Sequence, residues 1–335
     1  MPKGFRLFNV PSLFSTTDMS LSSKEKYRAL CLEERSIPIF SRDWWLDVVC
    51  GEENWEVLLV EEKERIVAAM PLYLRSKQMV TMPAYTQTMG PWFASPLDEQ
   101  KYTGRLSDLQ RYQKKLLAGL VNYPYFLQNF HHSVTDWLPF YWAGYKQTTR
   151  YTYLLPDISD MELLWKNMSS HTRREITHAG EKHHITVRNG VSTDDFIAIQ
   201  RKTFERQGKE PPHLPVLKRL IEACRQRGQG DIWGGYDEQG QLHAAVFAVW
   251  QESCAYNLAA GGDPQLRHSG AHALVLWRVI QSMAQYTRQF DFEGSMLPGV
   301  EIFFRNFGSI QKPYFTISKG KVSLWYRGWL KATGR

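Results

Sequence analysis

The sequence predicts an α/β (α+β) fold made of two tandem copies of one unit, each with a mixed central sheet flanked by helices. The first observation is a repeated order of elements: a hairpin, a helix, a strand, a short helix and a strand occur twice along the 335 residues. The second is size, because a chain of this length suits two domains. The third is composition, since 43% hydrophobic and 13% aromatic residues provide ample material for a folded core.

The first copy begins with a hairpin, whose strands we expect at residues 55–60 and 66–70 on either side of a charged turn. The polar residues ahead of it, 1–36, are expected to be a partly mobile lead-in. The first unit then covers residues 37–155. After the hairpin its expected elements are, in order, a helix at 106–120, a strand at 125–130, a short helix at 137–142 and a strand at 147–154.

The second copy follows a boundary near Pro156. Its hairpin has strands at 231–236 and 242–250, joined by Asp-Glu-Gln-Gly, which is suitable turn chemistry. We expect a second unit over 156–320 and a tail over 321–335. The later elements are, in order, a strand at 253–260 that Gly261 and Gly262 break, a helix at 271–286, a strand at 289–293, a short helix at 300–307 and a strand at 313–318.

The charge of the chain is moderately basic, at +7, and most of the excess lies in the second half. Residues 1–150 carry 18 Lys and Arg against 16 Asp and Glu, whereas residues 151–335 carry 23 against 18. This suits an anionic ligand, such as a phosphorylated cofactor or part of an RNA. No apolar run approaches the roughly 20 residues that span a bilayer, and the N-terminus lacks a signal-peptide pattern, so we expect a cytoplasmic protein.

Four cysteines, Cys31, Cys50, Cys224 and Cys254, form no C-x-x-C pair and are expected to be buried free thiols. Two histidines and an acid, His171, Glu175 and His178, share one helical face. They lack the order and the further ligand of a zinc site, so a solvated basic face is the better interpretation, and no metal is expected.

The loop at residues 261–271 leads from a strand into a helix that is apolar on nearly every face. Such a buried helix suits a crossover between parallel strands, and its start then lies where α/β folds bind ligands. Ser269 can cap this helix, Gly270 and Ala271 leave its amides accessible to an anion, and Arg267 adds positive charge. Tyr256, on the strand before, is grouped with these residues as a cofactor-binding candidate. The alternative is an ordinary capped helix.

The strand at residues 289–293 carries two acids, Asp291 and Glu293, which alternation places on one face. Neighbouring carboxylates disfavour joint ionisation, so one should have a raised pKa, as a base that deprotonates an attacking ammonium requires. The alternative is a structural pair, with Arg305 available to neutralise one member. Tyr314 on the last strand can protonate a leaving group, although a core tyrosine is the more common case.

Two further features complete the candidate site. Val300, Phe303, Phe304 and Phe307 follow helical spacing and are expected in the core. In the first unit, the loop at residues 85–92 is rich in hydrogen-bonding and aromatic groups. Its Gln87 and Trp92 are candidate acceptor-binding residues in a cleft between the units, as is Arg305, although a buried structural loop is an equal alternative.

The sequence resembles FemAB-like proteins in Phe-Asp-Phe-Glu-Gly-Ser at 290–295, in Phe-Phe-Arg-Asn-Phe-Gly at 303–308 and at Tyr314. These are double GNAT-fold acyltransferases, and the family includes the aminoacyltransferases that build peptidoglycan cross-bridges. Weaker similarity lies at 37–46, at 173–176 and at 267–271. Two departures stand out. His272 replaces the small residue of acetyl-CoA-binding loops, and residues 194–227 are too short for the helical arm of the tRNA-dependent members.

The resemblance implies two tandem GNAT-like units and an N-acyltransferase, with an acyl-CoA as the favoured donor. The acceptor would be an amine on a small molecule or a peptidoglycan precursor, attacking directly because no nucleophile-plus-base motif is visible. One alternative is a FemAB-type transferase that uses aminoacyl-tRNA as donor. Another is a non-catalytic binding module.

Overall fold

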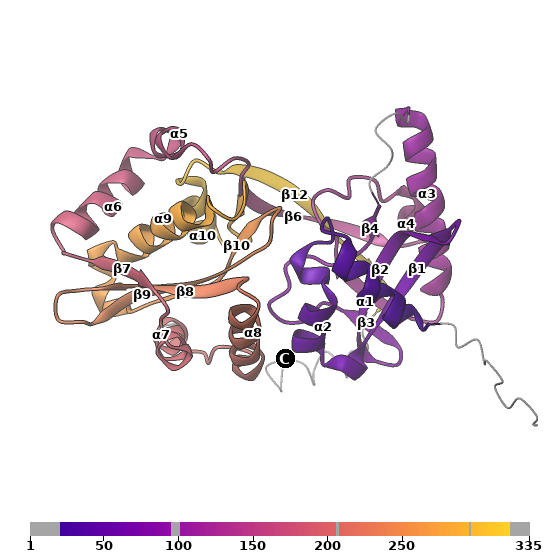
Figure 1. Ribbon diagram of the computed structural model, residues 1–335, viewed down its shortest axis with the longest axis horizontal. Coiled ribbons are helices and arrows are strands. Elements are labelled where there is room, and N and C mark those ends of the chain that lie inside the picture. The colour runs from indigo at the N-terminus through magenta and orange to yellow at the C-terminus, as the bar shows by residue number, and fades with distance from the viewer. Residues whose placement is uncertain (1–20, 95–100, 206–207, 295, 322–335) are drawn as a thin grey trace, which may run out of the picture.

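The computed structural model describes residues 21–94, 101–205, 208–294 and 296–321, and all structural statements concern these residues. Within them, the strands form one continuous sheet in the order β1-β2-β3-β5-β12-β6-β11-β10-β9-β8-β7, with β4 paired to β2. Figure 1 shows two lobes, one from each half of the chain, joined by β6 and β12. Helices cover the sheet, as the predicted α/β class requires.

The first half of the chain forms the lobe on the right of Figure 1. Residues of the expected lead-in are folded here, because α1 begins with a capping box at Ser22 and buries Tyr27 completely. The elements are α1 (Ser23–Glu33), α2 (Asp43–Cys50), β1 (Trp55–Glu62), β2 (Arg65–Ser76), β3 (Met79–Thr81), β4 (Trp92–Phe93), α3 (Tyr102–Gly119), β5 (Tyr125–Asn129), α4 (Leu138–Trp142) and β6 (Lys146–Leu155), with short 3-10 turns at Ile39–Ser41 and Glu52–Asn54.

The second half forms the other lobe, in which α9 and α6 lie on one face of the sheet and α7 and α8 on the other (Figure 1). The elements are α5 (Met161–Asn167), α6 (Ser170–Glu181), β7 (Thr186–Asn189), α7 (Thr193–Glu205), α8 (Leu214–Gln226), β8 (Gly230–Tyr236), β9 (Leu242–Trp250), β10 (Ala255–Gly262), the 3-10 helix η3 (Pro264–Ser269), α9 (Ala271–Met283), β11 (Phe290–Asp291), α10 (Pro298–Arg305) and β12 (Ile310–Lys319).

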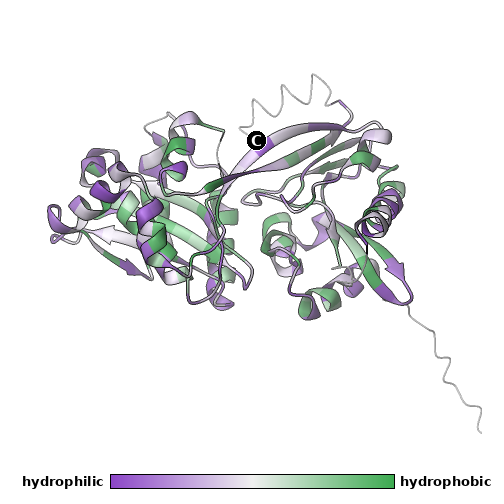
Figure 2. Cartoon of the chain, turned by 90° about the horizontal axis from the view of Figure 1, so that it is seen from above, coloured by the Kyte–Doolittle hydropathy of each residue, from purple (hydrophilic) through white to green (hydrophobic). Residues whose placement is uncertain are grey.

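The long antiparallel pair of β6 and β12 belongs to both lobes. At one end, residues 316–319 of β12 pair with β5 of the first lobe. At the other end, Leu154 and Leu155 of β6 pair with β11 of the second lobe. Figure 2, seen from above, shows these two strands passing from lobe to lobe. The lobes are therefore joined by a hydrogen-bonded ladder rather than by a single linker, which restrains their relative movement.

A shared core reinforces this connection. Phe40 on one lobe packs edge-to-face on Tyr256 of β10, with ring centroids 4.7 Å apart. The same cluster of buried side chains includes Trp45 of α2 and Leu217 of α8. Separate cores lie between the sheet and α9, and between the sheet and helices α3 and α4. All four cysteines are buried and free, as expected.

Several sequence-based expectations are corrected. Gly261 and Gly262 do not break the strand, because β10 continues through Gly262 and pairs with β9. The strand at 289–293 is much shorter, because β11 ends at Asp291. Val300 is 37% exposed rather than in the core. Of the expected tail, only Lys321 lies within the described residues. Among the helices that are described, none is long and apolar enough to cross a bilayer.

Candidate active site

A cavity of about 710 Å³ runs between strand β10 and helices α9 and α10. It exists because neighbouring strands separate. β10 pairs with β11 only at Ala255 and Tyr256, so the rest of that edge of β10 is not covered by β11. The ladder between β10 and β9 also shifts register between Asn257 and Ala259, as at a β-bulge. The cavity therefore follows the exposed edge of a distorted strand, where backbone and side chains can meet a ligand.

One end of the cavity is formed by the start of α9. Gly270 has φ +68°, and a Cβ there would lie 2.9 Å from the backbone oxygen of Glu175 in α6. Glycine is thus required both by the backbone conformation and by the close approach of α6. Ser269 lies just before this turn, and its Oγ accepts a hydrogen bond of 3.3 Å from the Ala271 amide. The first turn of α9 is consequently held in place while its end faces the cavity.

A histidine and an acid support Ser269 from β9 and from the hairpin turn. His243 Nδ1 lies 3.0 Å from Ser269 Oγ, and His243 Nε2 lies 3.1 Å from Asp237 Oδ2. His243 and Ser269 are both buried. Because each group has a hydrogen-bonding partner, this chain of contacts orients the loop before α9 rather than offering a free nucleophile.

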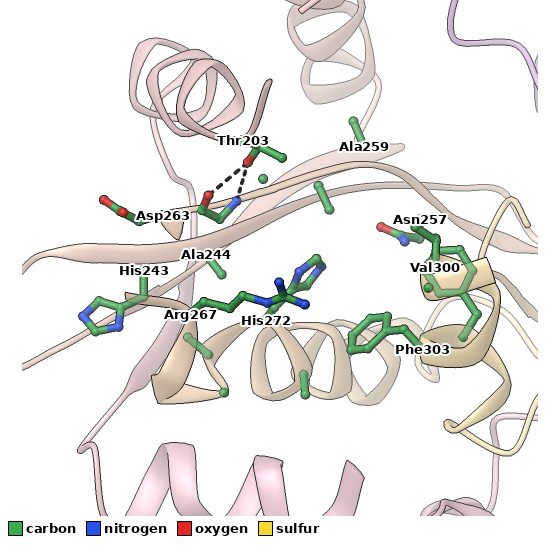
Figure 3. Close-up of a pocket in the computed structure, with 18 of the residues that line it drawn as sticks. Thr203, His243, Ala244, Asn257, Ala259, Asp263, Arg267, His272, Val300 and Phe303 are labelled. Carbon is green, nitrogen blue, oxygen red and sulfur yellow. Dashed lines mark hydrogen bonds between the residues drawn. The ribbon is translucent and has the colours of Figure 1, made fainter. Parts of the chain in front are cut away.

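Positive charge is concentrated at the same end. Arg267 lines the cavity, is exposed, and has no carboxylate partner among the described residues. Its guanidinium lies beside His272 in Figure 3. The nearby Asp263 is already neutralised by Lys202, whose Nζ lies 2.6 Å from its Oδ2. An unpaired arginine beside a helix N-terminus favours an anion such as a phosphate.

Three cavity-lining side chains each carry a buried polar atom that has no hydrogen-bond partner. These atoms are Asn257 Oδ1, His272 Nε2 and Glu293 Oε1. Buried polar groups are nearly always paired in native proteins, so three unpaired atoms around one cavity indicate a polar ligand. Burial, with a further contribution from Arg267, lowers the pKa of His272 to about 4, so its imidazole is neutral at neutral pH.

The two predicted acids lie next to each other, but not through strand alternation. Glu293 follows the end of β11 with φ +60°, a left-handed conformation, and its amide donates a 2.7 Å hydrogen bond to Asp291 Oδ1. Burial raises the pKa of Asp291 to about 6. Burial and the neighbouring Asp291 raise the pKa of Glu293 well above its usual range. Both pKa values are therefore raised, but the pairing contributes, as predicted, to that of one member, Glu293, whereas that of Asp291 is raised by burial.

Gln87 connects this pair of acids to the first lobe. Its Nε2 donates to Thr152 Oγ1 at 2.9 Å, and the Thr152 hydroxyl donates in turn to Asp291 Oδ1. Asn129 holds Gln87 from behind, through a hydrogen bond of 2.9 Å from Nδ2 to the Gln87 carbonyl. One side chain, that of Thr152, thus connects Gln87 to Asp291, and Gln87 is not among the residues that line the cavity.

The other candidate residues are placed differently. Tyr314 is buried, and its pKa is raised by burial although Arg150 lowers it; Asp291 and Glu293 are close enough to act on it. Trp92 is buried and donates from Nε1 to Ser36 Oγ at 2.9 Å, within the first lobe. Tyr256 packs on Phe40 and does not line the cavity.

Arg305 does not reach either acid. Its Nε lies 3.0 Å from Glu301 Oε1 on the same helix, and its side chain is exposed. Residues at i, i+4 on a helix are neighbours, so Arg305 pairs with Glu301 instead of neutralising Asp291 or Glu293. On α6, His171 and Glu175 form a loose contact of 3.7 Å. Within the described part of the chain, no group of three or more side chains could hold a metal ion.

Sequence reasoning missed Asn257, His243 and Thr152. Each sits in an ordinary strand, and only the register shift of β10, the hairpin pairing of β9 and the meeting of β6 with β11 bring them to the site. Asn257 in β10 and His243 in β9 each gave a signal, because each is a polar residue within a largely apolar strand.

Comparisons with known proteins concern the domain that holds the cavity and the fold of the whole chain. Residues 166–305 match a family model described as an acetyltransferase (GNAT) domain, whereas no curated protein matches the chain. Among solved structures, FemX is similar with a TM-score of 0.64 and 11% identity, over 88% of this chain and 96% of FemX. L-PGS from Bacillus licheniformis has a TM-score of 0.51 and 12% identity, over 90% and 94%.

A conserved protein of unknown function from Bacteroides thetaiotaomicron has a TM-score of 0.51 and 10% identity, over 91% of this chain and 98% of that one. At these identities the likeness concerns the fold, which spans both lobes, while the family model covers the lobe that holds the cavity. The second lobe therefore contains an acetyltransferase (GNAT) domain, and the chain as a whole shares the two-lobed fold of FemX.

Proposed function

We propose that this chain is an N-acyltransferase that moves an acyl group from an acyl-CoA to an amine, with the donor in the second unit. The observation that carries the proposal is the course of the cavity. It joins the start of α9 and Arg267 at one end to Glu293 and Asn257 at the other. A phosphate-binding end and a proton-accepting end in one cavity match a donor that has a phosphorylated handle and a reactive acyl group.

The residues present fit a CoA-type donor, which GNAT folds generally bind. Gly270, Ala271 and Arg267 would hold its phosphates, as the sequence predicts. The unpaired Asn257 Oδ1 and His272 Nε2 offer hydrogen-bonding positions along the cavity for amide groups of the same ligand. His272 stands where a smaller residue is usual in such loops. Its imidazole would therefore contact the ligand at a place where a smaller residue would leave the backbone accessible. When bound, the donor supplies an activated thioester.

The two acids provide the proton acceptor. Asp291 and Glu293 share a buried site, so at neutral pH the pair is expected to hold one negative charge and one proton. It can therefore accept one proton from an attacking ammonium. Glu293 is the member that lines the cavity and would meet the amine, while Asp291 is fixed by Thr152. Tyr314, close to both acids, would donate a proton as the thiolate leaves.

We infer that the amine enters from the side of the first unit. Gln87 and Thr152 approach the acids there, whereas the donor cavity lies on the side of α9 and α10. This separates donor and acceptor on opposite sides of the gap between β10 and β11, with Glu293 between them. Trp92 donates to Ser36 and Arg305 pairs with Glu301, so any role for them would be through packing.

A second candidate donor is an aminoacyl-tRNA. It is favoured by the basic residues Arg173 and Arg174 of α6 and Lys182 just after it. Helix α6 contacts η3, which leads into the proposed phosphate-binding loop. His183 of the turn after α6 lies with its ring 5.6 Å from His268. A polyanion bound there would show a steep loss of affinity with rising salt, whereas a CoA would show a shallow one. The acceptor would then be a peptidoglycan precursor, as for the FemAB-like relatives.

The test is a binding titration of CoA, acetyl-CoA and charged tRNA against the purified chain by calorimetry. We expect CoA to bind and Gly270→Trp to abolish binding, because the indole would fill the start of α9. Gly240→Trp, in an open turn with no neighbouring atoms within 4 Å of its Cβ, is the matched control. If CoA fails to bind while tRNA binds, the second donor is correct. If neither binds, the proposed function is wrong.

Turnover is tested separately, by thiol release from acyl-CoA in the presence of a panel of amines. Glu293→Gln should reduce the rate by about 10²–10⁴-fold, the usual contribution of a general base, with donor affinity changed by less than about threefold. Glu238→Gln, on the exposed hairpin turn, is the control for loss of one carboxylate. Unaltered turnover in Glu293→Gln would remove this residue from the mechanism.

A further inference from the structure

The cavity changes character along its length. Arg267, Asp263 and His243 are polar and lie at one end, whereas Val300 and Phe303 of α10 lie at the other, beside Asn257 (Figure 3). Leu297, just before α10, and Val300, Phe303 and Phe304 of α10 line the cavity, and none of them has a polar side-chain atom. We call these four residues the α10 wall.

The α10 wall is apolar and yet open. Val300 is 37% exposed and Leu297 is 66% exposed, although both line the cavity. Phe303 is half-buried, and its ring lies 5.2 Å from the ring of His272. Exposed apolar side chains that form one wall of a cavity, rather than being scattered singly, indicate a surface that an apolar ligand covers.

The position of the wall identifies which part of the ligand covers it. A donor whose phosphates are at Arg267 and the start of α9 presents its reacting carbon near Glu293. Whatever lies beyond that carbon meets the α10 wall, because Leu297, Val300 and Glu293 line the same cavity and Val300 and Phe303 lie beside Asn257, away from Asp263 and His243 (Figure 3). The wall offers no carboxylate for the ammonium of an aminoacyl group, since its four side chains are hydrocarbon throughout.

We propose, on the basis of the function proposed above, that the transferred group is an apolar acyl chain of medium or greater length, held along Leu297, Val300 and Phe303. A two-carbon acetyl group would leave most of this wall exposed to water. A chain of about eight carbons would cover it and gain the hydrophobic free energy of burial. The wall is thus the determinant of donor chain length in this enzyme.

The test compares the dissociation constants of acetyl-CoA and octanoyl-CoA by calorimetry, with free CoA as the baseline. A fully buried methylene strengthens binding about fourfold, so a half-covered chain gains about twofold per methylene, or about 60-fold from acetyl to octanoyl. Val300→Asp should reduce this ratio to near one. The matched control is Ile302→Asp, because Ile302 is 45% exposed on the same helix but does not line the cavity.

Val300→Trp provides a second test that keeps the wall apolar. The larger side chain fills the space, so it should weaken octanoyl-CoA more than acetyl-CoA. Equal affinity of the wild-type chain for both ligands would overturn the chain-length inference while leaving the acyl-CoA function intact. The same change of ratio in Ile302→Asp as in Val300→Asp would also overturn it. Absence of binding by all three CoA probes would instead contradict the proposed function.

Discussion

Gln87 Nε2 donates a hydrogen bond of 2.9 Å to Thr152 Oγ1, and the Thr152 hydroxyl donates onward to Asp291. These contacts join a loop of the first lobe to the acid pair of the second. Because a carboxylate gains more from a donor than a neutral carboxyl does, both contacts favour the ionised form of Asp291. The first lobe therefore lowers the pKa of Asp291, the member of the acid pair that Thr152 holds.

Replacing Thr152 with Val removes this donor without changing the side-chain shape much. The pKa of Asp291, about 6 in the native chain, should then rise by about one unit, since a hydrogen bond to a charged group contributes about 1.5–3 kcal/mol. The acidic limb of the pH–activity profile, or the carboxyl chemical shift of Asp291 in NMR, should move to higher pH. Thr149→Val, on the same strand, is the control; an unmoved titration would exclude the contact.

Asp291 should also influence stability. Its pKa is raised on folding from about 3.9 to about 6, so the folded chain holds this proton more tightly than the unfolded chain. The ionised group therefore costs stability, and this cost develops as the pH rises from about 4 to about 6. Asp291→Asn should raise the free energy of unfolding at pH 8 by about 1–3 kcal/mol, and the gain should vanish near pH 4.

Urea denaturation of both chains at pH 4, 6 and 8 measures this difference. A constant difference over that range would mean that Asp291 does not titrate as its burial implies. The same variant is expected to lose activity, so stability and function should change in opposite directions. Such opposition is usual where a charged group is buried for catalysis.

Gly270 should be one of the most sensitive positions in the cavity. Gly270→Ala combines the cost of a left-handed backbone with a Cβ placed 2.9 Å from the Glu175 oxygen. We expect a loss of about 2–4 kcal/mol in the free energy of unfolding, compared with about 1 kcal/mol for Gly240→Ala. Gly240 has a similar φ of +77° but open space around it. Thermal melts of the two variants therefore separate the cost of the left-handed backbone, which both share, from the cost of the steric clash with Glu175, which only Gly270→Ala has. Equal losses would contradict the close packing of α6 on this turn.

The sequence was sufficient to predict the repeated order of elements and the start of α9. These depend on local patterns, such as a Gly-Gly-Asp-Pro stretch before a helix that is apolar on nearly every face. It was also sufficient to bring Asp291 and Glu293 together, but for the wrong reason. Strand alternation would place the two acids on one face. In the structure the strand ends at Asp291, and the left-handed backbone at Glu293 brings the two acids together instead.

What the sequence does not reveal depends on contacts between distant segments. The joint ladder of β6 and β12 pairs residues more than 150 positions apart, and no local pattern specifies that register. Val300 illustrates a second difficulty. Its helical spacing identifies a face shared with Phe303 and Phe304, but spacing alone does not say whether that face meets the core or a cavity.

His272 provides the last prediction. Its Nε2 is buried without a partner in the cavity, and its low pKa of about 4 keeps the ring neutral. If this atom pairs with the donor, His272→Ala should weaken CoA binding by about threefold to tenfold, the value of one neutral hydrogen bond. Because the ring stays neutral, the weakening should be the same at pH 6 and pH 8. His268→Ala, in the exposed part of η3, is the control for loss of an imidazole near the same end. Tighter binding in His272→Ala would show instead that the ring obstructs the cavity, and a donor other than CoA would then be the better candidate.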